Sequence, residues 1–86
     1  MHKIYEDISR EYLSEKFKET RKQLGLTQEQ MAEKLDIAPR SYIEIEHGKS
    51  LCKVQTLFHF LSFFHSSEEL IKEITELFAE ATKTVI

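Results

Sequence analysis

The sequence predicts an all-α protein, and three observations support this prediction. Only two glycines and one proline interrupt a chain that is 41% hydrophobic and 31% charged, a composition typical of an ordered, mainly helical protein. Apolar residues recur with helical spacing in successive segments. Residues that start or end helices stand between these segments.

Length and composition limit what the chain can do. A chain of 86 residues suits one domain, 1–86, with a modest core. The single cysteine, Cys52, excludes an intrachain disulfide and a multi-cysteine zinc site, and is consistent with a reducing compartment. The N-terminus lacks the apolar run of a signal peptide, and the longest apolar stretch, 57–64, is too short to span a bilayer. We therefore expect a cytoplasmic protein with no membrane partner.

The first long helix is predicted at residues 5–24. Its apolar positions follow an amphipathic helical pattern: Ile8, Tyr12, Leu13, Phe17 and Leu24. Asp7 and Ser9 are candidate N-caps. Cations occupy the last turn and Gly25 follows, as the helix dipole and a left-handed C-cap favour. The boundary at the C-terminal end is the better defined of the two.

Two short helices separated by a tight turn are predicted within residues 27–48. Thr27 and Gln30 have the spacing of a capping box, and we expect Asp36 to end this helix. Pro39 suits the first turn of a second helix, 39–47, which Gly48 can close from a left-handed conformation. The first helix has one apolar stripe, and the second has one face that packs and one that is presented to solvent. The residues expected to pack are Met31, Ala32, Leu35, Tyr42 and Ile45.

Two further helices are predicted at 54–64 and at about 67–82. The first is apolar around most of its circumference, so we expect it to be buried on several sides. Its four phenylalanines are too many for one small core, so some should meet the N-terminal extension, the last helix or a second subunit. The last helix begins with a second capping-box pattern, Ser66 to Glu69, and separates an apolar side from its glutamates. It is too short to form a coiled coil by itself.

A family resemblance joins many of these positions at fixed offsets. The residues that carry it are Phe17 to Arg21, Gly25 to Glu29, Met31, Ala32, Ile37, Tyr42, Ile45, Glu46, Gly48 and Lys49, and more weakly Val54 to Leu57. This pattern resembles the phage-repressor-like (XRE or Cro-like) helix-turn-helix family over residues 14–65. The resemblance implies a compact five-helix domain, like that of lambda repressor, that binds operator DNA as a homodimer. It implies a dimeric repressor that reads a palindromic operator, with the last helix as a dimer contact.

The resemblance also assigns structural roles. It implies a packed ion pair between Arg21 and Glu46. Ala38 stands where the family commonly has Ser or Thr, so one capping bond is missing, and Cys52 stands where a proline is common. The segment before residue 14 lies outside the match, and we expect it to pack against the C-terminal helix.

The resemblance places the helix 39–47 in the major groove of double-stranded DNA. Base contacts are then assigned to Pro39, Arg40, Ile43 and Glu44. Arg40 is the main candidate, because a guanidinium can bond guanine O6 and N7 together. Glu44 either accepts from cytosine N4 or is an exposed partner of Arg40. Phosphate contacts are assigned to Gln28, Ser41, Lys49 and Lys53.

The net charge of −3 argues against strong non-specific DNA binding, but its distribution is uneven. Residues 16–53 hold eight Lys and Arg against six Asp and Glu, a net +2, whereas the flanks hold four against nine, a net −5. The excess acid therefore lies away from the predicted DNA face.

The sequence gives little support to catalysis or metal binding. Cys52, His47 and His59 lack an orienting constellation, so no catalytic site is predicted, and the four histidines have no metal-ligand spacing. No cofactor is expected. The serious alternative is a protein that acts through a protein partner, as the antitoxin of a toxin–antitoxin pair does. The acidic outer helices and the many aromatic residues motivate it.

Overall fold

The computed structural model describes residues 2–64 and 67–85 and consists, over these residues, of five helices without strands. They are α1 (His2–Gln23), α2 (Gln28–Leu35), α3 (Pro39–Glu46), α4 (Val54–Phe64) and α5 (Ser67–Val85). The molecule measures 42 × 24 × 21 Å. The all-α prediction is confirmed. None of the described helices is long and apolar enough to cross a membrane.

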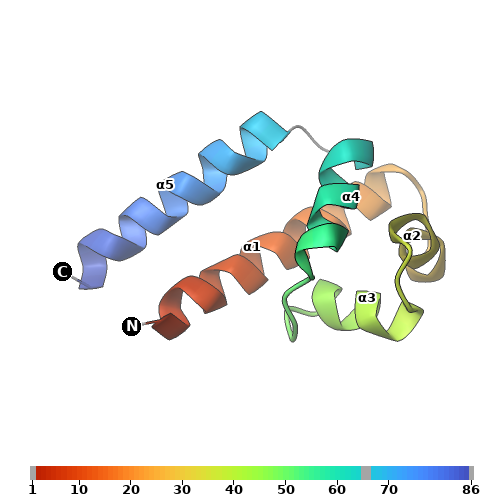
Figure 1. The fold of residues 1–86 in the computed structure, drawn as a ribbon, viewed down its shortest axis with the longest axis horizontal. Coiled ribbons are helices and arrows are strands. Elements are labelled where there is room, and N and C mark those ends of the chain that lie inside the picture. Colours follow the sequence, from red (N-terminus) through yellow and green to blue (C-terminus); the bar gives the residue numbers. More distant parts are fainter. Residues whose placement is uncertain (1, 65–66, 86) are drawn as a thin grey trace.

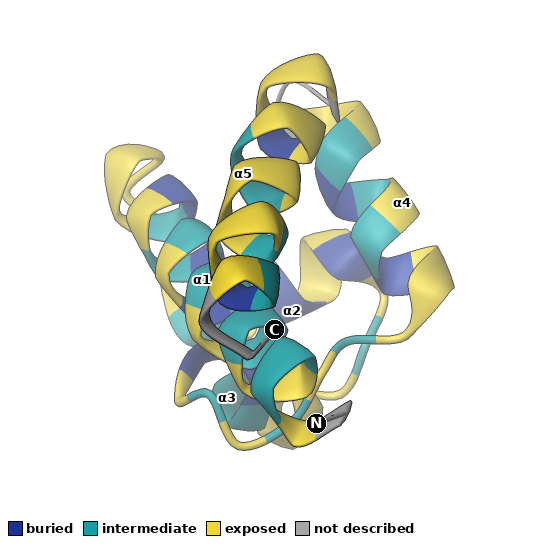
Figure 2. Cartoon of the chain, turned by 90° about the vertical axis from the view of Figure 1, so that its left-hand side faces the viewer, coloured by how far each residue is buried: buried dark blue, intermediate teal, exposed yellow. Residues whose placement is uncertain are grey.

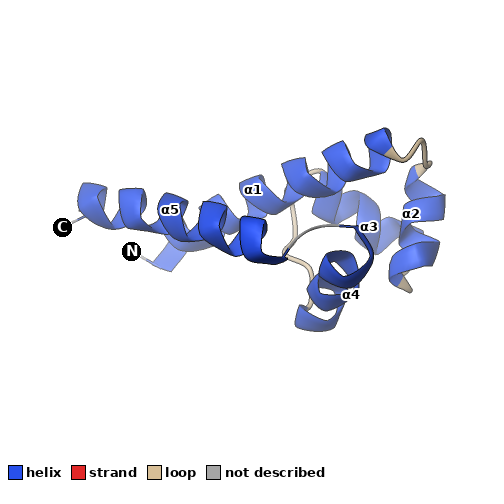
Figure 3. Ribbon diagram, turned by 90° about the horizontal axis from the view of Figure 1, so that it is seen from above, coloured by secondary structure: helices blue, strands red, loops and turns tan. Residues whose placement is uncertain are grey.

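The helices form two parts, which we call the head and the arm (Figure 1). The head consists of the second half of α1, residues 14–23, together with α2, α3 and α4. The arm consists of the first half of α1, residues 2–13, and α5, which returns beside it so that the start of α1 and the end of α5 lie close together. Viewed from above, the arm projects from the cluster formed by α2, α3 and α4 (Figure 3).

The core lies in the head, and Leu70 at the start of α5 completes it. Its buried side chains come from every helix: Phe17, Met31, Ala32, Leu35, Tyr42, Ile45, Phe60 and Leu70. Phe17 is at the centre, with its ring 4.3 Å from that of Phe60 and edge-on to that of Tyr42 at 6.1 Å. The apolar faces predicted for the two short helices are confirmed. Figure 2 shows buried residues where the helices of the head meet, and mostly intermediate or exposed residues along α5.

The first three helices end in the same type of turn. In each, a left-handed residue follows the helix: Gly25 (φ 69°), Asp36 (φ 59°) and Gly48 (φ 73°). The next amide reaches back five residues to a helix carbonyl, as in Leu26 to Arg21, at 3.1 Å. This is the Schellman arrangement, which satisfies carbonyls at the helix end. The predicted ends at Asp36 and Gly48 are confirmed, and the capping box of Thr27 and Gln30 is present.

The arm is held together by aromatic and polar contacts. The Tyr5 ring lies 5.0 Å from the ring of Phe78, and its hydroxyl is 2.7 Å from Thr82 Oγ1. The Tyr12 hydroxyl donates to Glu73 Oε1 at 2.8 Å, and burial together with this carboxylate raises the pKa of Tyr12. The predicted packing of the N-terminal segment on the last helix is confirmed.

Three details of the sequence prediction were wrong. α1 begins at His2 rather than residue 5, so neither proposed N-cap acts: Ser9 bonds the Tyr5 carbonyl within the helix, and Asp7 pairs with Arg10. α4 is not buried on several sides, because Val54, Phe58 and Phe63 are each more than 60% exposed.

The third error concerns α5. Ile71 and Leu77 are exposed, although the pattern put them on the packed side, and Glu73 faces α1 rather than solvent. The reason is that a helix lying on a single neighbour buries only a narrow stripe, whereas the sequence pattern marks a wide apolar face. The proposed cap at Ser66 lies outside the described residues.

Candidate nucleic-acid interface

The inner face of α3 is anchored in the core. Tyr42, Ile45 and Glu46 are buried, and Pro39 occupies the first turn of the helix. His47 caps the C-terminal end, so α3 stops one residue earlier than predicted. As expected from the sequence, Ala38 makes no side-chain capping bond at the N-terminal end. α3 is thus held mainly by its buried face.

A buried network fastens α3 to α1 and α2. Arg21 forms two bonds to Glu46, Nε to Oε2 at 2.7 Å and Nη2 to Oε1 at 2.9 Å. Glu46 also accepts from the Tyr42 hydroxyl and from Gln28 Nε2, the latter at 3.1 Å. The ion pair implied by the family resemblance is therefore present. Its carboxylate is almost fully surrounded by donors.

This network controls the ionisation of Glu46. Burial by itself raises the pKa of the carboxyl, but the hydrogen bonds from its three partners outweigh burial and lower the pKa to about 2. Burial and the Glu46 carboxylate raise the pKa of Tyr42, so its hydroxyl remains a donor. Glu46 therefore stays charged at neutral pH, matched by the guanidinium of Arg21.

The outer face of α3 is presented to solvent. The side chain of Arg40 is 94% exposed, Pro39 and Ser41 are exposed, and Ile43 is half-buried. Glu44 lies near Arg40, with Oε1 4.0 Å from the Arg40 Nε, and accepts from Ser50 Oγ at 3.3 Å. Of the two roles predicted for Glu44, the structure without DNA shows the pairing with Arg40, at a long distance of 4.0 Å.

The remaining predicted contact residues surround α3. Lys49 and Lys53 are exposed, and neither makes an ion pair within the described part of the chain. Gln28 is half-buried at the first turn of α2, and its amide already donates to Glu46. One amide hydrogen of Gln28 is left over, because a side-chain amide has two donors.

Sequence reasoning missed the roles of Tyr42 and Gln28 in this network. Tyr42 was assigned only to the apolar face of α3. The spacing of four residues between Tyr42 and Glu46 places both on one helical face, which was the available signal. The position of Gln28 beside Glu46 depends on how α2 meets α3, which no local pattern encodes.

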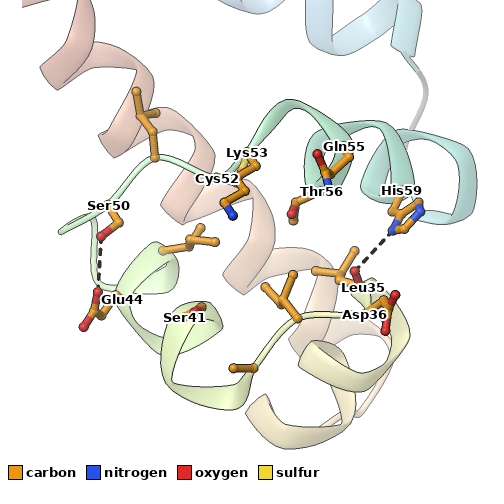
Figure 4. Close-up of a pocket in the computed structure, with 14 residues that line it drawn as sticks. Leu35, Asp36, Ser41, Glu44, Ser50, Cys52, Lys53, Gln55, Thr56 and His59 are labelled. Atoms are coloured by element: carbon orange, nitrogen blue, oxygen red, sulfur yellow. Dashed lines mark hydrogen bonds between the residues drawn. The ribbon is translucent and has the colours of Figure 1, made fainter.

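No group of His, Cys, Asp and Glu in residues 2–64 and 67–85 could hold a metal ion. A cavity of about 410 Å³ lies between α3 and the start of α4 (Figure 4). Ser41, Glu44 and Lys53, three of the predicted contact residues, line it. The cavity therefore borders the outer face of α3.

The fold and the presented helix define a helix-turn-helix protein: α2 and α3 are joined by a tight left-handed turn, and α3 is exposed along one side. The protein belongs to the helix-turn-helix domain family, whose model matches residues 14–83. Neither the curated proteins nor the solved structures contain a significant match to the chain. Membership of this family indicates a DNA-binding regulator.

Proposed function

We propose that this protein is a sequence-specific transcription regulator of the phage-repressor-like type, a dimeric repressor that reads a palindromic operator. The observation that carries the proposal is the division of α3 into a buried inner face and an outer face on which Arg40 is 94% exposed. A helix held in this way can enter the major groove without losing its packing. The core thus orients the residues that read the DNA.

In this proposal Arg40 reads a guanine, with Pro39, Ile43 and Glu44 beside it at the base edges. The Arg40–Glu44 pair does not prevent this, because an exposed pair at 4.0 Å contributes little and is easily exchanged for a better partner. Phosphates are contacted by Gln28 through its second amide hydrogen, and by Ser41, Lys49 and Lys53.

The homodimer is proposed to form through the arm. α5 packs on α1 along one stripe and leaves Ile71 and Leu77 exposed, 57% and 39% respectively. A second copy packed against the Ile71 edge of this stripe would bury that side chain and would place two α3 helices for two half-sites. Analytical ultracentrifugation of Ile71→Asp checks this: we expect a shift to monomer. The control Ala79→Asp introduces the same charge at an exposed position two turns further along α5, away from the Ile71 side, and should remain dimeric.

The central test is selection from a random duplex library at low salt, about 50 mM, where phosphate contacts are strongest. Enrichment of a palindrome with half-site centres roughly 10 bp apart would support a two-fold dimer with recognition helices one DNA turn apart. Failure to enrich any sequence would exclude sequence-specific binding.

A matched pair of variants isolates the base contact. Arg40→Ala should relax specificity at one base pair of each half-site by roughly 1–3 kcal/mol. Lys22→Ala removes the same charge from an exposed site on α1, outside α2 and α3, and should keep the specificity of the parent. Equal sequence preference in the two variants would remove Arg40 from the base-reading role.

A second candidate function is binding of a protein partner, as in an antitoxin. It is favoured by the exposed aromatic residues of α4, Phe58 at 63% and Phe63 at 65%. Exposed aromatic side chains of this size are the kind of surface that a protein partner covers. Salt distinguishes the two functions, because DNA affinity falls steeply with salt whereas an apolar protein interface is nearly insensitive to it.

A further inference from the structure

The cavity beside α3 has a polar interior. Four segments enclose it: the turn after α2, α3, the connection 50–53, and the first half of α4 (Figure 4). Its volume of about 410 Å³ lies within the range of small-ligand sites. On the side lined by Ser41 and Glu44, the cavity borders the face of α3 that is proposed to bind DNA. On the side lined by Thr56, it extends behind that face.

Thr56 is the most deeply buried of the polar residues that line the cavity. Thr56 is only 3% exposed, and its side chain makes no hydrogen bond to any described residue. Figure 4 shows it pointing into the cavity. A buried hydroxyl without a partner is unfavourable, so a group bound in the cavity would supply the hydrogen bond that the protein does not.

The N-terminus of α4 opens onto the same space. The first hydrogen bond of this helix runs from the Leu57 amide to the Lys53 carbonyl, at 3.1 Å. The amides of residues 54–56 come before it and have no acceptor in the described part of the chain. Free amides and the positive end of the helix dipole attract anions.

Two cavity-lining side chains add donors. Lys53 forms no ion pair with any residue in the described ranges 2–64 and 67–85, whereas Lys16, Lys18 and Lys83 each lie near a glutamate. Figure 4 shows Lys53 next to Thr56 at the top of the cavity and Ser41 across from them on α3. The Ser41 hydroxyl also has no partner among the described residues. Donors thus converge from two helices.

The negative groups lie at the edges. Glu44 and Asp36 line opposite ends of the cavity in Figure 4, and Glu44 is already bonded to Ser50. Burial raises the pKa of the Cys52 thiol, so at neutral pH it is uncharged and does not repel an anion. The region around Thr56 and Lys53 therefore favours negative charge.

We propose that this region is an oxyanion site that binds a phosphate group through the Thr56 hydroxyl, the Lys53 ammonium and the first amides of α4. The phosphate belongs either to the DNA backbone or to a small phosphorylated molecule. In the first case the site deepens the proposed function. In the second it is a regulatory site, because Ser41 and Lys53 serve both the cavity and the proposed DNA contact, so the ligand competes with DNA.

The test begins with the protein alone and inorganic phosphate, followed by amide NMR spectra at constant ionic strength. In the wild type we expect saturable shifts concentrated at residues 54–56. Thr56→Val keeps the shape but removes the hydroxyl, and should weaken phosphate binding by about tenfold or more, as expected for one bond to a charged group. Ser62→Ala, which removes an exposed hydroxyl from the same helix, should bind phosphate like the wild type.

A second variant, Lys53→Gln, is exposed and should fold normally while also weakening phosphate binding. Shifts that do not concentrate at residues 54–56, or a phosphate affinity unchanged in Thr56→Val, would overturn the site. This phosphate titration uses no DNA, so it tests the site even when the wild type binds no operator. The absence of operator binding would overturn the proposed function instead.

DNA binding then identifies the source of the phosphate. When the site holds a backbone phosphate, Thr56→Val weakens DNA binding by a similar factor on every sequence. When it holds a free ligand, Thr56→Val binds DNA like the wild type, and phosphate at constant ionic strength inhibits only the wild type. Either result supports the site.

Discussion

The head and the arm are built from the same kind of amphipathic helix, but they differ in how completely their side chains are buried. In the head, the Phe17 ring of α1 contacts Tyr42 of α3 and Phe60 of α4, and all three side chains are fully buried. In the arm two helices pack on each other alone: no described side chain of residues 3–13 is buried, and Ala81 is the one buried side chain within residues 71–83. The number of covering layers, rather than the local pattern, therefore decides burial.

This difference is consistent with the two proposed roles, DNA binding by the head and dimerisation through the arm. The surface proposed for DNA is supported by the closed core and the Glu46 network, so its geometry is fixed before binding. The arm keeps apolar surface that a second copy or another partner would complete. The two parts should therefore differ in stability.

The largest effect is expected from removing an aromatic ring in each part. Phe17→Ala should lower the free energy of unfolding by about 3–5 kcal/mol, because it leaves a cavity at the centre of the core. Phe78→Ala, at the half-buried ring contact with Tyr5, should lower it by less than about 2 kcal/mol. Urea denaturation measures both. Equal losses of unfolding free energy in the two variants would mean that the arm is packed as tightly as the head.

The buried carboxylate of the head should be nearly as important as Phe17. Glu46→Ala strands the Arg21 guanidinium and should cost about 3–5 kcal/mol, with a sharply lower melting temperature. Glu33→Ala removes an exposed carboxylate from α2 and is the control, with a change within about 0.5 kcal/mol. A melting temperature of Glu46→Ala equal to that of the control would show that the network contributes little.

The same carboxylate predicts acid sensitivity. Its pKa is lowered to about 2 in the folded chain from an ordinary value of 4.5, so its stabilisation is present above pH 4.5 and is lost as the pH falls towards 2. The loss amounts to about 3 kcal/mol over this interval. Denaturation curves at successive pH values measure it. Glu46→Gln should flatten this dependence, and an equally steep curve in that variant would assign the effect to other carboxyls.

The arm should be weakened more gently by losing its interhelical hydrogen bond. Tyr12→Phe deletes the bond to Glu73 Oε1 and should reduce the free energy of unfolding by about 1 kcal/mol. Amide hydrogen exchange should show faster exchange along α5 and unchanged exchange in α2 and α3. Acceleration throughout the chain would indicate that head and arm open as one unit.

The smallest effect concerns the left-handed turns of the head. Asp36→Gly should raise the free energy of unfolding by up to about 1 kcal/mol, because φ is 59° at this position and glycine adopts that conformation without strain. Gly25→Ala is the reverse change, since the added Cβ meets no atom within 4 Å but φ is 69°. Gly25→Ala should lower the free energy of unfolding by about 1 kcal/mol. Thermal melts compare the two, and a loss of stability in Asp36→Gly would give its side chain a role of its own.

Much of the head was predictable from the sequence because its information is local. The capping box at Thr27, the helix ends at Asp36 and Gly48, and the buried stripe through Met31 and Leu35 all follow from spacing within a few residues. The Arg21–Glu46 pair came instead from family resemblance, since the two residues are 25 positions apart.

The candidate site was only partly predictable for the same reason. The exposed face of α3 follows from helical periodicity, which places Arg40 opposite Tyr42 and Ile45. The bond from Gln28 to Glu46 and the position of Thr56 in a cavity shared with α3 depend on how separate helices meet. Local pattern contains no information on these distances.

The sequence by itself thus determined the helices, their ends and which face of α3 packs, because hydrogen bonding within a helix and the period of its apolar residues are local properties. Only the tertiary structure decided which apolar faces are covered. It buried Phe60, left Phe58 and Phe63 in solvent, and turned Glu73 towards α1. The physical reason is that burial depends on how many neighbours surround a helix, and that number is set by the whole fold.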